Sequence, residues 1–129
     1  MQVLFIEDDS MNRRVVADML RVAGVEMAEA EDAERGLAMI DQGQYDLILM
    51  DLRMPGMDGL TAIRLIRGRS DDKAMLPIIV VTADTGVDLA SRCAESGADD
   101  FLMKPVAMDA LFDAIGRLLA QRQDGAALL

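Results

Sequence analysis

Three acidic side chains follow two buried runs of this chain, in positions that suit a divalent cation. Glu7 and Asp8 come directly after the apolar run Val3–Ile6. Asp51 comes directly after a second such run, Leu47–Met50. If the two runs are neighbouring parallel strands, their carboxyl ends meet at one edge of a sheet and the three acids converge. Carboxylates so close together repel one another, so without a counterion at least one of them has a raised pKa.

A hard cation resolves this repulsion. The chain has no histidine and a single cysteine, so oxygen ligands favour Mg²⁺ over zinc, with Mn²⁺ as the alternative ion. Mg²⁺ takes few protein carboxylates and keeps waters, which leaves positions for a phosphate oxygen. Thr82 and Lys104 follow two further runs on the same predicted rim, and a lysine beside a metal spreads the charge of phosphoryl oxygens. A carboxylate held beside that metal can act as the nucleophile and become an aspartyl phosphate.

The elements that must position these residues alternate along the chain. Three continuous apolar runs predict strands buried on both faces of a parallel sheet: Val3–Ile6, Leu47–Met50 and Ile78–Val81. Two shorter and more mixed runs suit edge strands: Val25–Ala28 and Phe101–Met103. Apolar residues at helical spacing lie between and after the runs, which gives five strands and five helices in alternation. We therefore predict an α/β fold, a five-stranded parallel sheet of order 2-1-3-4-5 with helices on both faces (a flavodoxin-like three-layer α/β/α sandwich).

Some residues carry local predictions. Ser10 and the neighbouring Asp9 are both placed to cap the first helix, and Asp32 is placed to cap the second. We assign three arginines to the solvated face of the third helix: Arg64, Arg67 and Arg69.

Length and composition bound the function. The 129 residues fit one domain, predicted over residues 1–121, with a short tail over 122–129 and no output domain. A formal net charge of −10 repels nucleic-acid phosphates and anionic lipid, which excludes sequence-independent DNA binding. No segment approaches the roughly 20 apolar residues of a membrane helix, and the first nine residues do not form a secretory signal. With one cysteine, the chain is expected in the reducing cytoplasm.

The motifs resemble the receiver domain of two-component response regulators, and the resemblance covers about residues 2–120. All four motifs stand in order and at suitable spacing. They are Glu7-Asp8, the run Asp51-Leu52-Arg53-Met54-Pro55-Gly56-Met57-Asp58-Gly59, Thr82-Ala83 and Lys104-Pro105. Any one of these acids alone is commonly a helix cap, and it is the combination that favours the receiver.

The resemblance implies a metal-assisted phosphoacceptor. Asp51 resembles the residue that takes the phosphoryl group. Asp8 matches the direct Mg²⁺ ligand, and Glu7 matches the acid that acts on the metal through water. Arg53 occupies the position whose backbone carbonyl coordinates the metal.

The resemblance also implies a switch. Thr82 matches the hydroxyl that bonds one phosphoryl oxygen, and Lys104 matches the ammonium that pairs with another; the Lys104–Pro105 peptide bond is implied to be cis. Phe101 stands where the family keeps a switch aromatic, which turns into the space that Thr82 leaves when it moves toward the phosphoryl group. That would reshape the surface of the fourth helix, fifth strand and fifth helix. The alternative interpretation of Phe101 is a strand-edge hydrophobe.

Two residues flank the predicted site. Arg53 lies two places after Asp51, and Asp84 lies two places after Thr82. A pair between them across the pocket mouth would hinder the water that hydrolyses the acyl phosphate, and so would tune its lifetime. The simpler interpretation is an exposed pair that contributes under about 1 kcal/mol and gates nothing.

The leading hypothesis is a phosphorylation-dependent signalling switch rather than an enzyme, with autophosphorylation from small donors and autodephosphorylation. Because the chain has no histidine, the phosphohistidine donor is another protein, a histidine kinase or a histidine phosphotransfer protein. The signal passes to a downstream protein target, with no DNA and no membrane involved, from a monomer or a weak dimer.

Two other functions stay open. A Mg²⁺-dependent phosphatase of the haloacid dehalogenase type also uses an aspartate nucleophile, but it needs a second aspartate two residues later, where this chain has Arg53. A pseudo-receiver would act only as an interaction module, and it is disfavoured because no site residue is missing.

Overall fold

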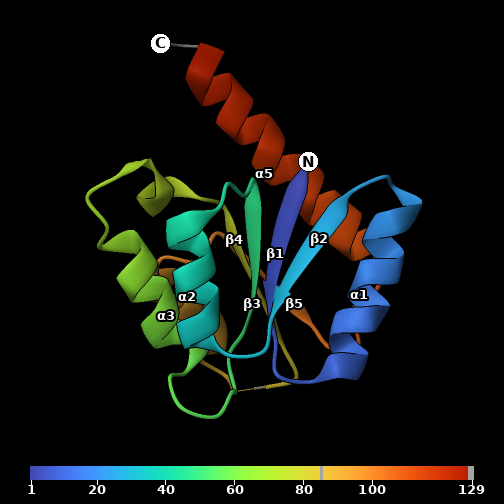
Figure 1. Ribbon diagram of the computed structural model, residues 1–129, viewed down its shortest axis with the longest axis vertical. Coiled ribbons are helices and arrows are strands. Elements are labelled where there is room, and N and C mark those ends of the chain that lie inside the picture. The colour runs from blue at the N-terminus through green and yellow to red at the C-terminus, as the bar shows by residue number, and fades with distance from the viewer. Residues whose placement is uncertain (85, 128–129) are drawn as a thin grey trace.

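The computed structural model describes the backbone of residues 1–84 and 86–127 and side chains as far as Gln121. Five parallel strands form one sheet of order β2-β1-β3-β4-β5, which confirms the predicted topology (Figure 1). The strands are β1 (Gln2–Ile6), β2 (Glu26–Ala30), β3 (Leu47–Asp51), β4 (Ile78–Thr82) and β5 (Asp100–Met103). The helices are α1 (Ser10–Val22), α2 (Ala33–Gln42), α3 (Gly59–Arg67), α4 (Leu89–Ser96) and α5 (Met108–Ala127), with a short 3₁₀ helix, η1 (Asp72–Met75).

Alternate residues of the central strands enter two separate cores. On β1, Leu4 and Ile6 point to the core under α2, α3 and α4, and Val3 and Phe5 point to the core under α1 and α5. All four are fully buried, as the continuous apolar run predicts for a strand covered on both faces. Each such side chain contributes about 2 kcal/mol by leaving water, so the sheet is a rigid platform for whatever follows the strand ends.

Aspartates cap the first three helices. Asp9, rather than Ser10, caps α1, because the helix already begins at Ser10 and the Asp9 carboxylate accepts from the Met11 N–H at 2.8 Å. Asp32 caps α2 as predicted, accepting from the Arg35 N–H at 2.8 Å. Each cap satisfies an N–H that the first turn leaves unpaired, and fixes the angle at which the chain leaves the sheet edge.

The start of α3 lies directly against the end of β3. A Cβ at Gly59 would stand 2.2 Å from the Asp51 carbonyl oxygen, so only glycine permits this approach. The carboxylate of Asp58 caps the same helix by accepting from the Thr61 N–H at 2.8 Å. Together they hold the loop that follows Asp51 close to the sheet edge.

The assignment of three arginines to a solvated face is wrong for two of them. Arg64 is exposed, but Arg67 donates to the carbonyls of Gly97, Ala74 and Leu76 at 2.7–2.8 Å. Arg69 is also drawn inward, with the exposed fraction of its side chain at 21%, by carboxylates on two sides. Loop carbonyls and acids that converge here are set by tertiary structure, which helical periodicity does not report.

The second strand and the last helix differ most from the predicted bounds, and the other strands differ by one residue. The second strand runs over Glu26–Ala30 rather than Val25–Ala28. Residues 122–127, predicted as part of a tail, continue α5 to Ala127. The end of α5 extends past the edge of the sheet (Figure 1). The remaining tail residues, 128 and 129, lie outside the described residues.

Candidate functional site

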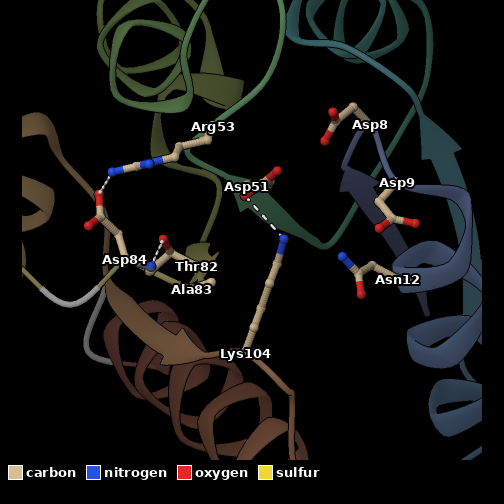
Figure 2. Close-up of a pocket in the computed structure, with 9 residues that line it drawn as sticks. All are labelled: Asp8, Asp9, Asn12, Asp51, Arg53, Thr82, Ala83, Asp84 and Lys104. Atoms are coloured by element: carbon tan, nitrogen blue, oxygen red, sulfur yellow. Dashed lines mark hydrogen bonds and ion pairs between the residues drawn. The ribbon is translucent and has the colours of Figure 1, made fainter.

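A cavity of about 340 Å³ opens at the carboxyl edge of the sheet (Figure 2). The ends of four strands and the start of α1 line it: Asp8, Asp9, Asn12, Asp51, Arg53, Thr82, Ala83, Asp84 and Lys104. Six of these were predicted site residues, and they come from segments as far apart as residues 8 and 104. Figure 2 shows Lys104 and Asp51 between the α1 side and the Arg53–Asp84 side.

Three carboxylates meet at the carboxyl ends of β1 and β3. Glu7, Asp8 and Asp51 each offer one oxygen, and these oxygens lie within 4.8 Å of one another. They converge because β1 and β3 are paired with Ile6 opposite Met50, which places Glu7, directly after β1, next to Asp51, the last residue of β3. Glu7 and Asp51 are buried, whereas Asp8 is exposed at the mouth. Such a group of hard oxygen donors suits Mg²⁺.

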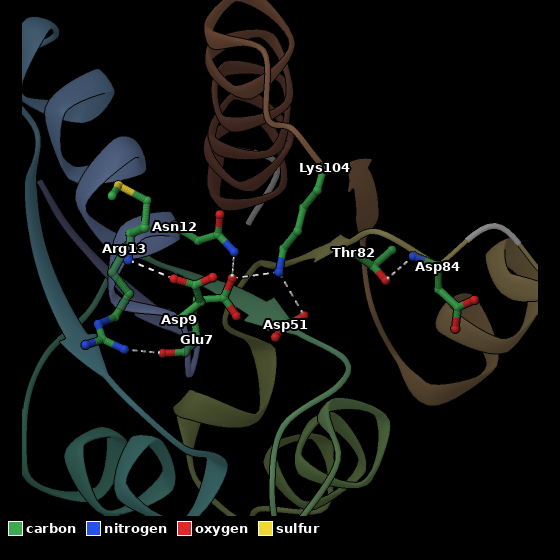
Figure 3. Close-up of polar contacts among 9 residues, drawn as sticks. Glu7, Asp9, Asn12, Arg13, Asp51, Thr82, Asp84 and Lys104 are labelled. Carbon is green, nitrogen blue, oxygen red and sulfur yellow. Dashed lines mark hydrogen bonds and ion pairs between the residues drawn. The ribbon is translucent and has the colours of Figure 1, made fainter.

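Glu7 is the most constrained of the three. Its Oε1 accepts from Asn12 Nδ2 at 2.8 Å and from Lys104 Nζ at 2.6 Å (Figure 3). Its Oε2 is buried and has no hydrogen-bond partner among the described residues. Burial, and next the neighbouring Asp51, raise the pKa of Glu7 from 4.5 to about 7, against the lowering effect of Lys104. An orphaned carboxylate oxygen beside two more acids fits a hydrated cation.

Lys104 links the two buried acids. Its Nζ lies 2.6 Å from Glu7 Oε1 and 3.3 Å from Asp51 Oδ1. Burial alone would lower the pKa of Lys104, but the hydrogen bond to Glu7 and the charges of Asp51 and Glu7 outweigh burial and raise it. The backbone of Lys104 is tied to β4 by its N–H donating to the Thr82 carbonyl at 2.8 Å, and the Lys104–Pro105 peptide bond is cis.

The other side of the pocket carries a hydroxyl and an ion pair. Thr82 is buried at the end of β4, and its Oγ1 accepts from the Asp84 N–H at 3.0 Å. The Asp84 carboxylate pairs with Arg53 Nη2 at 3.0 Å across the mouth. The Arg53 side chain is 81% exposed, so the pair stands in solvent and its strength is low.

Phe101 does not line the pocket. It is half-buried on β5 and packs against the core under α2, α3 and α4. Its partner in the sheet is Val80 of β4, two residues before Thr82. Phe101 is thus separated from the acids by the end of β4.

Two residues of α1 contribute contacts that the sequence analysis did not predict. Asn12 holds Glu7 through its side chain, and Arg13 donates to the Glu7 carbonyl at 2.7 Å (Figure 3). Arg13 also pairs with Glu29 of β2 at 2.7 Å, which ties three elements together beneath the pocket. Their position one turn past the Asp9 cap, on the side of α1 that faces the acids, is the signal that could have revealed them.

Comparisons with known proteins agree with this geometry. The chain matches the model of the response regulator receiver domain over residues 3–116. The chain belongs to this family. Receiver domains are switch modules of two-component signalling, so the match favours the receiver over the phosphatase alternative. None of the helices that the structure describes is long and apolar enough to cross a membrane.

Individual relatives show how far the similarity extends. The chain is 32% identical to chemotaxis protein CheY of Pseudomonas aeruginosa over 92% of the chain and 95% of that protein. A receiver protein from Pseudomonas putida is 33% identical, with a TM-score of 0.81 over 90% of this chain and 95% of that one. The receiver domain of sensor histidine kinase PA1611 from P. aeruginosa, solved with a magnesium ion in its active site cleft, is 32% identical, with a TM-score of 0.81 over 90% and 94%. The chain spans a third or less of the length of the first curated relatives it matches.

Proposed function

We propose that the receiver, residues 1–121, is a phosphoacceptor switch that takes a phosphoryl group on Asp51 with Mg²⁺ and signals by protein contact. The observation that carries the proposal is the convergence of Asp51 with Glu7, Asp8 and Lys104 at one strand edge. Three acids with a single ammonium leave negative charge that a cation would balance, and a buried nucleophile beside that cation suits phosphoryl transfer.

Asp8, Asp51 and the backbone carbonyl of Arg53 would hold the metal directly, and Glu7 would act through a water. Support comes from the orphaned Glu7 Oε2 and from the PA1611 receiver domain, which holds magnesium in its cleft. When bound, Mg²⁺, or Mn²⁺ as the alternative ion, would neutralise charge on the phosphoryl oxygens.

The chain's own residues supply the remaining steps. An Asp51 oxygen attacks phosphorus in line, the P–N bond of the phosphohistidine breaks, and its electron pair leaves on the imidazole. Thr82 Oγ1 already accepts from a backbone N–H, so its hydroxyl proton is left to donate to a phosphoryl oxygen. Lys104, held between Glu7 and Asp51, pairs with another phosphoryl oxygen. Attack by water later returns Asp51 to its free state.

Phosphorylation would act through the far side of β4. When Thr82 moves toward the phosphoryl group, Phe101 turns into the space it leaves and reshapes the α4–β5–α5 surface. Half-burial of Phe101 beside the end of β4 supports this interpretation. The switch is a population shift, so its size equals the difference in contact energy between the two arrangements.

The donor is a histidine kinase or a histidine phosphotransfer protein in the cytoplasm, and the receiver works as a monomer or a weak dimer. Met11 and Val15 of α1 are 66% and 42% exposed next to the acidic mouth, which supports docking of the donor there. The output is a downstream protein rather than DNA or a membrane.

The test is phosphorylation by acetyl phosphate in Mg²⁺, followed on a phosphate-affinity gel. Wild type should shift to a slower band that disappears with EDTA, and Asp51→Asn should not shift. Asp9→Asn is the matched control, because it makes the same change at an acid of the same pocket and asparagine still caps α1. Rapid turnover of phosphomonoesters would identify a phosphatase instead, and absence of any modification would leave an interaction module.

A further inference from the structure

A second cleft lies between α3 and α4, next to the phosphoacceptor pocket. Its volume is about 320 Å³, and we call it the arginine cleft. Three buried leucines form its floor: Leu52, Leu60 and Leu89. Three guanidinium side chains line it from three different elements: Arg53, Arg64 and Arg92. The cleft can therefore contact an apolar group through its leucines and an anionic group through its arginines.

The arginines of the cleft are only partly paired with carboxylates of the chain that the structure describes. The lining holds three guanidinium groups and two carboxylates: Asp84 pairs with Arg53 at 3.0 Å, and Asp58 accepts from the Thr61 N–H with one oxygen, so a net positive charge remains. Arg64 and Arg92 are exposed and form no ion pair with any side chain that the structure describes. Most other arginines are paired with carboxylates of their own chain, namely Arg13, Arg21, Arg35, Arg67, Arg69 and Arg117. In a chain of net charge −10, two unpaired guanidiniums at one cleft are exceptional.

We propose that the arginine cleft binds an acidic segment of a protein partner, in which carboxylates alternate with apolar side chains. Each guanidinium group presents paired N–H donors that match the two oxygens of a carboxylate. Arg64 lines the cleft from α3, and Arg92 lines it from α4. The leucine floor receives the apolar neighbour. This surface lies between α3 and α4, so it shares α4 with the α4–β5–α5 face that the proposed switch would reshape but contains no residue of β5 or α5.

Other anionic ligands fit the cleft less well. A free phosphate site needs a donor held away from water, and all three arginines of the cleft are exposed. A nucleotide base stacks on aromatic rings, and none of the four aromatic residues of the chain lines the cleft. An anionic membrane would extend beyond the cleft over the rest of the surface of a molecule of net charge −10 and would be repelled there, whereas a narrow segment meets mainly the cleft.

The net charge does not prevent an acidic segment from binding at contact. Charges farther apart than about 8 Å are screened at physiological salt, so a segment in the cleft is attracted mainly by the arginines that line it. Repulsion by the rest of the surface slows the approach of an acidic partner and raises selectivity for one that fits the cleft.

The arginine cleft shares a wall with the phosphoacceptor pocket. Arg53 and Asp84 line both cavities, so a carboxylate that draws Arg53 away from Asp84 changes the mouth above Asp51. The coupling is reciprocal. If a ligand at Asp51 changes the affinity of the cleft for the segment by some factor, the segment changes the affinity for that ligand by the same factor. Binding of the segment itself does not require phosphorylation.

The test uses ¹⁵N-labelled protein and a synthetic peptide of alternating glutamate and leucine, with a matched glutamine–leucine peptide. The glutamate peptide should shift the backbone amide signals of Arg64, Leu89 and Arg92, and the glutamine peptide should not. The double variant Arg64→Ala with Arg92→Ala should weaken binding at least tenfold. The double variant Arg14→Ala with Arg21→Ala removes equal charge from α1, on the other face of the sheet, and should stay within twofold of wild type. Asp51→Asn should still bind, which separates this proposal from the phosphoacceptor proposal.

Four outcomes would overturn the proposal. Shifts confined to other surfaces, or equal binding by the glutamine peptide, would exclude an acidic segment. Stronger shifts of the same amides with inorganic phosphate or ATP would assign the cleft to a small anion. A dimer in sedimentation equilibrium that the cleft variant abolishes would assign it to a second copy of the chain.

Discussion

The two ends of the sheet, where the strands finish and where they begin, differ in how well their charged side chains are paired. We call them the carboxyl edge and the amino edge. At the carboxyl edge, Glu7, Asp8 and Asp51 crowd together with one ammonium between them, and one buried oxygen is left without a partner. At the amino edge, Arg67 meets three backbone carbonyls and the Asp99 carboxylate. There Arg69 lies between two carboxylates, so its charge is also matched.

This difference separates function from stability. Matched charges and satisfied carbonyls hold η1, the loop before β5 and the end of α3 together, and they need nothing from outside the chain. Unmatched acids cost folding free energy and persist where a ligand is to complete them. Substitutions should therefore destabilise the protein at the amino edge and stabilise the metal-free protein at the carboxyl edge.

The largest effect is expected for Arg67→Ala. It removes the hydrogen bonds to the carbonyls of Gly97, Ala74 and Leu76 and the ion pair with Asp99, so the free energy of unfolding should fall by about 3 kcal/mol. Urea unfolding followed by circular dichroism measures the change. Arg21→Ala, an exposed pair on α1, is the control and should change stability by under about 1 kcal/mol. If Arg67→Ala lost as little unfolding free energy as the control, Arg67 would not be what holds the amino edge together.

The sequence predicts the residues at the carboxyl ends of the strands better than the Arg67 contacts at the amino ends. Short apolar runs and a fixed strand order place Asp51 beside Asp8 without any knowledge of side-chain packing, because register alone decides it. The contacts of Arg67 depend on where three loops converge, and no local pattern reports that.

Within the site, the sequence predicts which residues gather but not how they pair. Lys104 was expected to serve a phosphoryl group, yet its shortest contact is with Glu7. The Asn12 contact with Glu7 depends on the angle at which α1 leaves the Asp9 cap. Both contacts follow from the depth at which Glu7 is buried, which spacing along the chain does not fix.

An intermediate effect of opposite sign is expected for Glu7→Gln without divalent cations. Burial and Asp51 raise the pKa of Glu7 to about 7 in the folded protein, from 4.5. Between these values the folded state holds a proton that the unfolded chain has released, so the contribution of Glu7 to stability is lost as pH rises from about 4.5 through about 7. A shift of this size corresponds to on the order of 3 kcal/mol.

Glutamine has no such titration, so the stability of Glu7→Gln relative to wild type should increase from pH 4.5 to pH 8. Unfolding in EDTA at each pH measures this difference, and Glu26→Gln on β2 is the control for loss of an exposed carboxylate. A difference that stays constant with pH would mean that Glu7 has the same pKa in the folded and the unfolded states, and the contrast between the two edges would weaken.

The smallest effect on stability, and the sharpest on chemistry, is expected for Arg53→Ala and Asp84→Ala. Their ion pair stands in solvent, so each variant should lose under about 1 kcal/mol of unfolding free energy. Because the pair spans the mouth above Asp51, its removal should let water reach an acyl phosphate more readily and shorten the half-life severalfold, without preventing phosphorylation. The decay of label from protein phosphorylated on Asp51 measures this, and each variant should give the same change because each removes the same contact. Equal half-lives in both variants and wild type would reduce the pair to an exposed contact that gates nothing, and leave lifetime to the buried residues of the pocket.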